Sequence, residues 1–141
     1  RILTVTSGWS EAYGLFLDGE ADMVLSYTTS PAYHIIAEGD DSKAAAPFEE
    51  GHYLQVEVAG ILANAPQPEL AARFMAFMLS DGFQAIIPET NWMYPARTPD
   101  DGLPEGFGRL MVPQRSLLFS PDEARAVRDV ALAEWLAALR R

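Results

Sequence analysis

The clearest indication of the fold comes from residues 23–33, which run Met23-Val24-Leu25-Ser26-Tyr27-Thr28-Thr29-Ser30-Pro31-Ala32-Tyr33. The apolar start predicts a buried strand over 21–27. Ser30-Pro31 is typical of a helix start, because the Ser hydroxyl can accept from free backbone N–H groups and Pro fits the first turn. We therefore expect two tyrosine rings and three hydroxyls beside the positive end of a helix. Such a group of rings and hydroxyls suits a flat, polar ligand with an anionic end.

A similar junction precedes this one. Residues 2–6 alternate as in a strand, Ser7-Gly8 turns the chain, and residues 9–17 carry apolar side chains at helical spacing. The strand–helix–strand order is typical of an α/β fold with a parallel sheet, whose strands end at a common ligand-binding crevice. Trp9 follows the first strand and Tyr27 the second, so we expect both at that crevice.

The composition changes after residue 38. Residues 39–51 are small, polar and acidic, and they mark a candidate domain boundary. The extended pattern over 52–62 then resembles a crossover between two lobes, since Val, Tyr and Leu favour strands.

Three further helices are predicted in the remainder of the chain. One begins at Pro68, a short one spans about 82–87 and ends at Pro88, and the last begins at Pro121 and runs to about Leu139. Ser120 and Glu123 form a capping box at the start of that last helix. We expect the helix to bury one apolar face, made of Val127, Val130, Ala131 and Trp135.

The composition excludes several classes of function. A formal net charge of −10 opposes binding to nucleic acid, and the absence of cysteine excludes disulfides, thiolate metal sites and Cys nucleophiles. The sequence has no phosphate loop, no HExxH and no Gly-x-Ser-x-Gly motif. His34 and His52 lie in unrelated contexts, and each is expected to be a surface or packing residue. We therefore predict no catalytic residue, no metal site and no cofactor.

Four strings in this chain resemble the family of periplasmic thiamine-binding proteins, the substrate-binding components of thiamine ABC importers. They are Ser7-Gly8-Trp9-Ser10-Glu11-Ala12-Tyr13-Gly14-Leu15-Phe16-Leu17, Leu25-Ser26-Tyr27-Thr28-Thr29-Ser30-Pro31-Ala32-Tyr33-His34, Glu50-Gly51-His52-Tyr53-Leu54-Gln55-Val56-Glu57 and Asn91-Trp92-Met93-Tyr94-Pro95. The resemblance covers nearly the whole chain.

The resemblance implies an α/β, partial type II periplasmic binding-protein fold with two lobes, the N-terminal half lying outside this sequence. Residues 1–50 would complete the second lobe and carry ligand contacts. Residues 51–62 would form the crossover strand, and residues 63–141 would return to the first lobe.

The resemblance also implies a ligand-binding set of aromatic rings for the heterocycles and hydroxyls for a phosphate: Trp9, Tyr27, Tyr33 and Trp92, with Thr28, Thr29 and Ser30. Glu89-Thr90 departs from the family pattern, which has Thr-Gly there. The implied partners are thiamine or its mono- and diphosphate, and a membrane permease with its ATPase subunit. The implied location is the periplasm.

Two alternatives stay open at this point. Tyr27 and Tyr33 are candidate phenolate ligands in a binding protein for ferric iron or another small solute. The chain can also belong to a thiamine-modifying enzyme, whose nucleophile would have to lie outside this sequence.

Overall fold

The computed structural model describes residues 2–139 and divides them into two compact units. Within the described residues, unit 1 consists of 2–26 and 117–139, and unit 2 of 27–116. These units differ from the expected segments 1–50, 51–62 and 63–141, and the assignment of those segments to two lobes stays a prediction.

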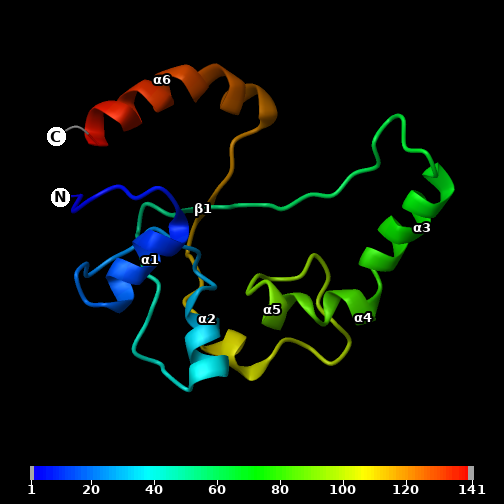
Figure 1. Ribbon diagram of the computed structural model, residues 1–141, viewed down its shortest axis with the longest axis horizontal. Coiled ribbons are helices and arrows are strands. Elements are labelled where there is room, and N and C mark those ends of the chain that lie inside the picture. Colours follow the sequence, from blue (N-terminus) through cyan, green and yellow to red (C-terminus); the bar gives the residue numbers. More distant parts are fainter. Residues whose placement is uncertain (1, 140–141) are drawn as a thin grey trace. The chain divides into compact units, whose positions relative to one another are not determined.

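Unit 1 contains two helices, α1 (Trp9–Leu17) and α6 (Pro121–Leu139) (Figure 1). Helix α1 has the predicted bounds and ends where the Asp18 N–H donates to the Gly14 carbonyl at 2.9 Å. Helix α6 begins with the predicted capping box. The Glu123 N–H donates to Ser120 Oγ at 3.3 Å, and the Ser120 N–H donates to Glu123 Oε2 at 2.9 Å.

The expected buried face of α6 is wrong for the residues that the structure describes. Val127, Val130 and Trp135 are 39%, 62% and 55% exposed, and Ala131 is exposed as well. The periodic pattern places these side chains along one stripe, but it carries no information on what covers the stripe.

A helical segment over 31–38 begins at Pro31, as the Ser30-Pro31 pair predicts. Helix α2 (Pro31–Tyr33) continues directly into the π-helix η1 (His34–Glu38). Gly39 ends the segment in the left-handed conformation, with φ at 68°, and the Asp40 N–H then donates to the His34 carbonyl at 2.9 Å. Glycine adopts that conformation without a Cβ clash.

The predicted strands are mostly wrong. The only β-pairing among residues 2–139 joins β1 (His52–Tyr53) to β2 (Ser116–Leu117), where the His52 N–H donates to the Arg115 carbonyl at 3.0 Å. Residues 2–6, 23–27 and 54–62 have no regular secondary structure. A β-prone segment becomes a strand only when a neighbour accepts and donates its backbone hydrogen bonds, and no described segment does so here.

The second half of unit 2 contains α3 (Pro68–Met78), α4 (Asp81–Gln84), α5 (Ile87–Thr90) and the 3-10 helix η2 (Glu105–Arg109). Helix α3 begins at the predicted proline. The helix expected over 82–87 is wrong: two short helices occur, and Pro88 lies in the first turn of α5, where its missing N–H costs no hydrogen bond.

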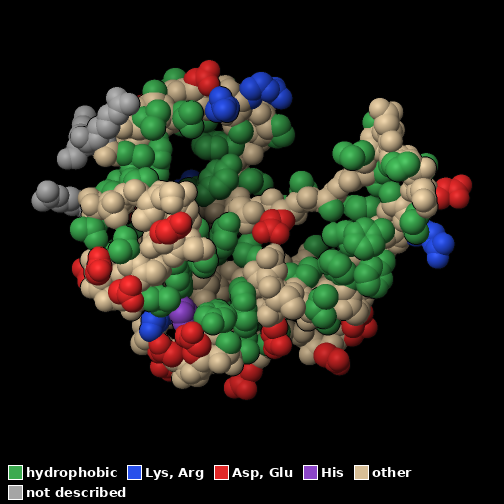
Figure 2. Space-filling view, in the orientation of Figure 1, with side chains coloured by type: hydrophobic (Ala, Val, Ile, Leu, Met, Phe, Trp, Pro, Cys, Tyr) green, Lys and Arg blue, Asp and Glu red, His purple; other side chains and the backbone are tan. Residues whose placement is uncertain are grey.

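Helix α3 carries an apolar surface. Leu70, Phe74 and Phe77 are each more than half exposed, and Figure 2 shows hydrophobic side chains gathered there. No single helix in residues 2–139 has the length and apolarity of a membrane span. Helix α3 and the α4–α5 segment meet those two criteria only as a pair bent by 65°.

The core of unit 2 is small and lies where α2–η1 meets η2. Its buried members are Ala32, Phe107 and Leu110. Partly buried side chains pack around them: Ile35, Ile36, Trp92 and Leu103. The core therefore connects the segment after the Tyr27–Tyr33 junction to the loop that carries Trp92.

Candidate ligand-binding site

The structure brings Tyr33 and Trp92 together. Their ring centroids lie 5.2 Å apart with the planes at 83°, an edge-to-face contact of the kind that aromatic pairs favour. Tyr33 is 41% exposed, whereas Trp92 is partly buried against the core. Two aromatic residues from distant parts of the sequence thus form one partly exposed surface, which we call the Tyr33–Trp92 pair.

The loop around Trp92 is fixed by its neighbours. Trp92 itself has a left-handed backbone, with φ at 55°. The next residue, Met93, accepts at its sulfur from the Thr29 hydroxyl at 3.5 Å, and the Tyr94 ring meets the edge of Phe107 at 5.5 Å. Partial burial raises the pKa of the Tyr94 phenol.

The hydroxyls at 28–30 are placed differently from one another. Thr29 is 3% exposed, and its hydroxyl is directed to Met93. Ser30 Oγ accepts from the Tyr27 N–H at 3.2 Å, and Thr28 is partly exposed in the same turn. The ligand roles of these three hydroxyls stay predictions.

The predicted capping role of Ser30 is wrong. Ser30 already has helical dihedral angles, with φ at −55° and ψ at −35°, and its side chain makes no cap hydrogen bond. A cap residue needs an extended backbone for its oxygen to reach the first free N–H groups. Ser30 instead closes the turn that holds Tyr27, whose side chain is 49% exposed.

Trp9 lies in unit 1, at the first turn of α1. Its indole N–H donates to Ser26 Oγ at 3.2 Å, and its ring lies 4.7 Å from that of Tyr13 at a tilt of 32°. Trp9 is still 54% exposed, so much of its ring is free for stacking. Its ligand role also stays a prediction.

Both histidines contact neighbouring side chains. His34 is 1% exposed, and its Nδ1 lies 2.6 Å from Glu38 Oε2 within η1, which confirms it as a packing residue. The His34 ring also meets the edge of Tyr33 at 5.2 Å. His52 opens β1, where its ring lies 5.5 Å from that of Phe48. No group of three His, Asp or Glu side chains in residues 2–139 is arranged to hold a metal ion.

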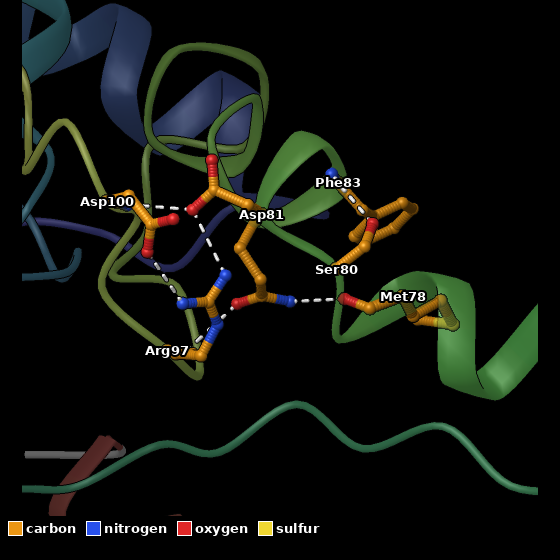
Figure 3. Close-up of polar contacts among 7 residues, drawn as sticks. Met78, Ser80, Asp81, Phe83, Arg97 and Asp100 are labelled. Atoms are coloured by element: carbon orange, nitrogen blue, oxygen red, sulfur yellow. Dashed lines mark hydrogen bonds and ion pairs between the residues drawn. The ribbon is translucent and has the colours of Figure 1, made fainter.

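Sequence reasoning missed a polar network that links α4 to the end of the Trp92 loop. The Gln84 amide is central to it: Nε2 donates to the Met78 carbonyl at 2.6 Å, and Oε1 accepts from the Arg97 N–H at 3.1 Å. The Arg97 guanidinium also reaches Asp81 at 3.0 Å and Asp100 at 3.1 Å (Figure 3). The irregular, proline-rich sequence around Arg97 has no periodicity from which these contacts could be predicted.

The family follows from comparison with known proteins. Residues 2–85 match the model of the family described as bacterial extracellular solute-binding protein. The chain belongs to this family. That assignment confirms the expected binding-protein fold, and a solved structure titled periplasmic thiamin binding protein agrees. It matches with a TM-score of 0.85 and 57% identity over 95% of this chain and 42% of that one.

The curated relatives point the same way. The thiamine-binding periplasmic protein of Escherichia coli (strain K12) is 56% identical over 141 residues, which is 100% of this chain and 42% of the relative. The resemblance inferred from the four sequence strings is therefore confirmed. A more distant relative, iron uptake protein A1 of Synechocystis, is 30% identical over 83% of this chain and 36% of its own length. The chain thus spans less than half the length of these relatives.

Proposed function

We propose that this chain supplies part of the thiamine-binding surface of a periplasmic solute-binding protein that delivers thiamine to an ABC-type permease and its ATPase subunit. The observation that carries the proposal is the Tyr33–Trp92 pair, a partly exposed aromatic surface packed against the core of unit 2. The names of the similar proteins support thiamine as the ligand and the periplasm as the location.

The chemistry of thiamine suits such a surface. Its aminopyrimidine is flat and stacks on aromatic rings, and its thiazolium is a cation that ring faces attract, each contact contributing about 0.5–2 kcal/mol. Tyr27 and Trp9 present further exposed rings, each within its own unit.

The phosphate forms of thiamine need hydrogen-bond donors. Thr28 is partly exposed in the 28–30 turn, whereas Thr29 is buried against Met93. Thiamine mono- and diphosphate are therefore secondary ligands in this proposal, with Thr28 and Ser30 as the residues to test.

The alternatives have less support. A ferric-iron site draws on the similarity to iron uptake protein A1 and on the two tyrosines, but residues 2–139 hold no carboxylate–histidine group arranged for a metal. A thiamine-modifying enzyme finds no support in the names of the relatives, which are those of binding and uptake proteins.

Calorimetric titration of the full-length protein with thiamine tests the proposal. We expect saturable binding and a Kd raised about 5- to 30-fold in Tyr33→Ala or Trp92→Ala, since each removes one ring contact of roughly 1–2 kcal/mol. Trp135→Ala is the control, because Trp135 is an exposed indole on α6, outside the predicted ligand-binding set. No heat signal at millimolar thiamine would overturn the proposal.

Two added measurements separate the alternatives. A visible absorption band on addition of ferric iron would favour the iron-binding function. Conversion of thiamine by the full-length protein, followed by chromatography, would favour the enzyme.

A further inference from the structure

The 91–97 loop, which carries Trp92, is held by hydrogen bonds at both ends. At its start, the Asn91 N–H donates to the Ile87 carbonyl at 2.9 Å, and Asn91 Nδ2 donates to Glu57 Oε2 at 3.2 Å. At its end, the Arg97 N–H donates to Gln84 Oε1 at 3.1 Å. Trp92, Met93 and Tyr94 lie between these two anchors.

The two anchors differ in burial. Asn91 and Glu57 are exposed, so their hydrogen bond competes with water. Gln84 is 3% exposed, and both polar atoms of its amide are bonded. A buried amide with both atoms bonded fixes the loop more strictly than an exposed one. An alternative loop position would leave the buried Oε1 without a partner, while Nε2 stays bonded to the Met78 carbonyl.

The charged groups reinforce the buried anchor. Asp81 Oδ1 accepts from the Arg97 guanidinium at 3.0 Å and from the Asp100 N–H at 2.7 Å, as Figure 3 shows. Arg97 and Asp81 are 47% and 40% exposed, so this ion pair alone contributes little to stability. Its geometric effect is to hold the chain on both sides of Pro99 against the start of α4.

We propose that Gln84 is a positioning residue for the ligand surface: it sets the end of the 91–97 loop and thereby holds Trp92 against Tyr33. The inference rests on the proposed function, since it assigns Gln84 an effect on thiamine affinity without contact to thiamine. Gln84 supplies no ring to the surface, so we expect its effect on thiamine affinity to act through the position of Trp92.

A double-mutant cycle in the full-length protein tests this. Gln84→Met keeps the side-chain length and removes both hydrogen bonds; we expect the Kd for thiamine to rise roughly three- to tenfold. In a Trp92→Ala background, Gln84→Met should then change the Kd by less than about twofold, because the ring that it positions is gone. Equal losses in both backgrounds would overturn the proposal. Gln114→Met, at an exposed glutamine, is the control.

A ligand-free measurement separates this inference from the proposed function. Hydrogen–deuterium exchange of the 91–97 peptide should be faster in Gln84→Met, and also in Asp81→Ala, whose exposed side chain can be removed without opening the core. Unchanged exchange in both variants would overturn the anchor even if thiamine binds. If the unsubstituted protein does not bind thiamine, the proposed function fails, and faster exchange would still identify Gln84 as the anchor of the loop.

Discussion

Gly106 is the residue at which the core of unit 2 leaves least space. A Cβ at this position would lie 2.5 Å from Ile36 Cγ1 and 3.2 Å from Ile35 Cγ2. Real Cβ atoms do not approach carbon so closely, so η2 rests directly on η1 because residue 106 has no side chain. The contact sets how near Phe107 comes to Ala32.

We therefore predict that Gly106→Ala lowers the free energy of unfolding by about 1–3 kcal/mol, the usual cost of overpacking a core. Chemical denaturation of the full-length protein measures it. Gly108→Ala is the matched control in the same 3-10 helix, because a Cβ at 108 meets no atom within 4 Å. Equal stability of the two variants would contradict the packing described here.

At the scale of elements, α6 depends on its first turn, because its apolar side chains are exposed and add little. Ser120 Oγ donates to Glu123 Oε2 at 2.7 Å and accepts from the Glu123 N–H. We predict that Ser120→Ala destabilises the start of α6 by about 1 kcal/mol, seen as faster amide exchange over 121–125. Ser116→Ala, an exposed serine in β2, should leave that exchange unchanged.

The contact between Ser120 and Glu123 makes the stability of the first turn of α6 depend on pH. Hydrogen bonds from the Ser120 hydroxyl and N–H hold the pKa of Glu123 below its ordinary value. A lowered carboxylate pKa means that the stabilisation is present above the unfolded value, about pH 4.3, and is lost as the pH falls through the folded value. Ser120→Ala should raise the pKa of Glu123, measured by NMR titration. An unchanged titration would show that the capping box does not act on this carboxylate.

Local signals predicted the helices well and the strands poorly. Residues 9–17 and 31–38 and the start of α6 were predictable because spacing, a proline or a capping box lies within the element itself. The extended segment 54–62 was not, because strand formation depends on a neighbour that local sequence does not identify.

The sequence suggests which residue types would line the candidate site, whose ligand roles stay predictions, but it does not suggest their contacts. The strings containing Tyr33 and Trp92 indicated aromatic ligand residues, and the structure adds that the two rings touch. The burial of Thr29 under Met93 and the Gln84 anchor join residues far apart in sequence. No periodic pattern encodes such pairs.

At the scale of the whole molecule, residues 2–139 bury little apolar surface. Among them, the hydrophobic core cluster has three buried members, while Leu25, Val58 and Leu62 are 81%, 89% and 80% exposed. Stability of a domain comes mainly from apolar burial that offsets chain entropy, so this chain has little margin.

We predict that the 141-residue chain produced alone binds the dye ANS and unfolds over a broad temperature range. Exposed apolar side chains and loose packing give this behaviour. Dye fluorescence and differential scanning calorimetry measure it, with the full-length protein as the comparison. A sharp calorimetric transition without dye binding would contradict this prediction.

Trp92 has a left-handed backbone, with φ at 55°. This conformation sets the stability of the protein against the ligand affinity that an indole at this position would provide. For most residues that conformation costs about 1–2 kcal/mol. Gly adopts it readily because it has no Cβ, and Asn tolerates it because its short polar side chain can hydrogen-bond locally. A library at this position selected only for heat resistance should therefore enrich Gly and Asn. Under the proposed function, the selected clones would be more stable and would bind thiamine more weakly, because they lack the indole at position 92.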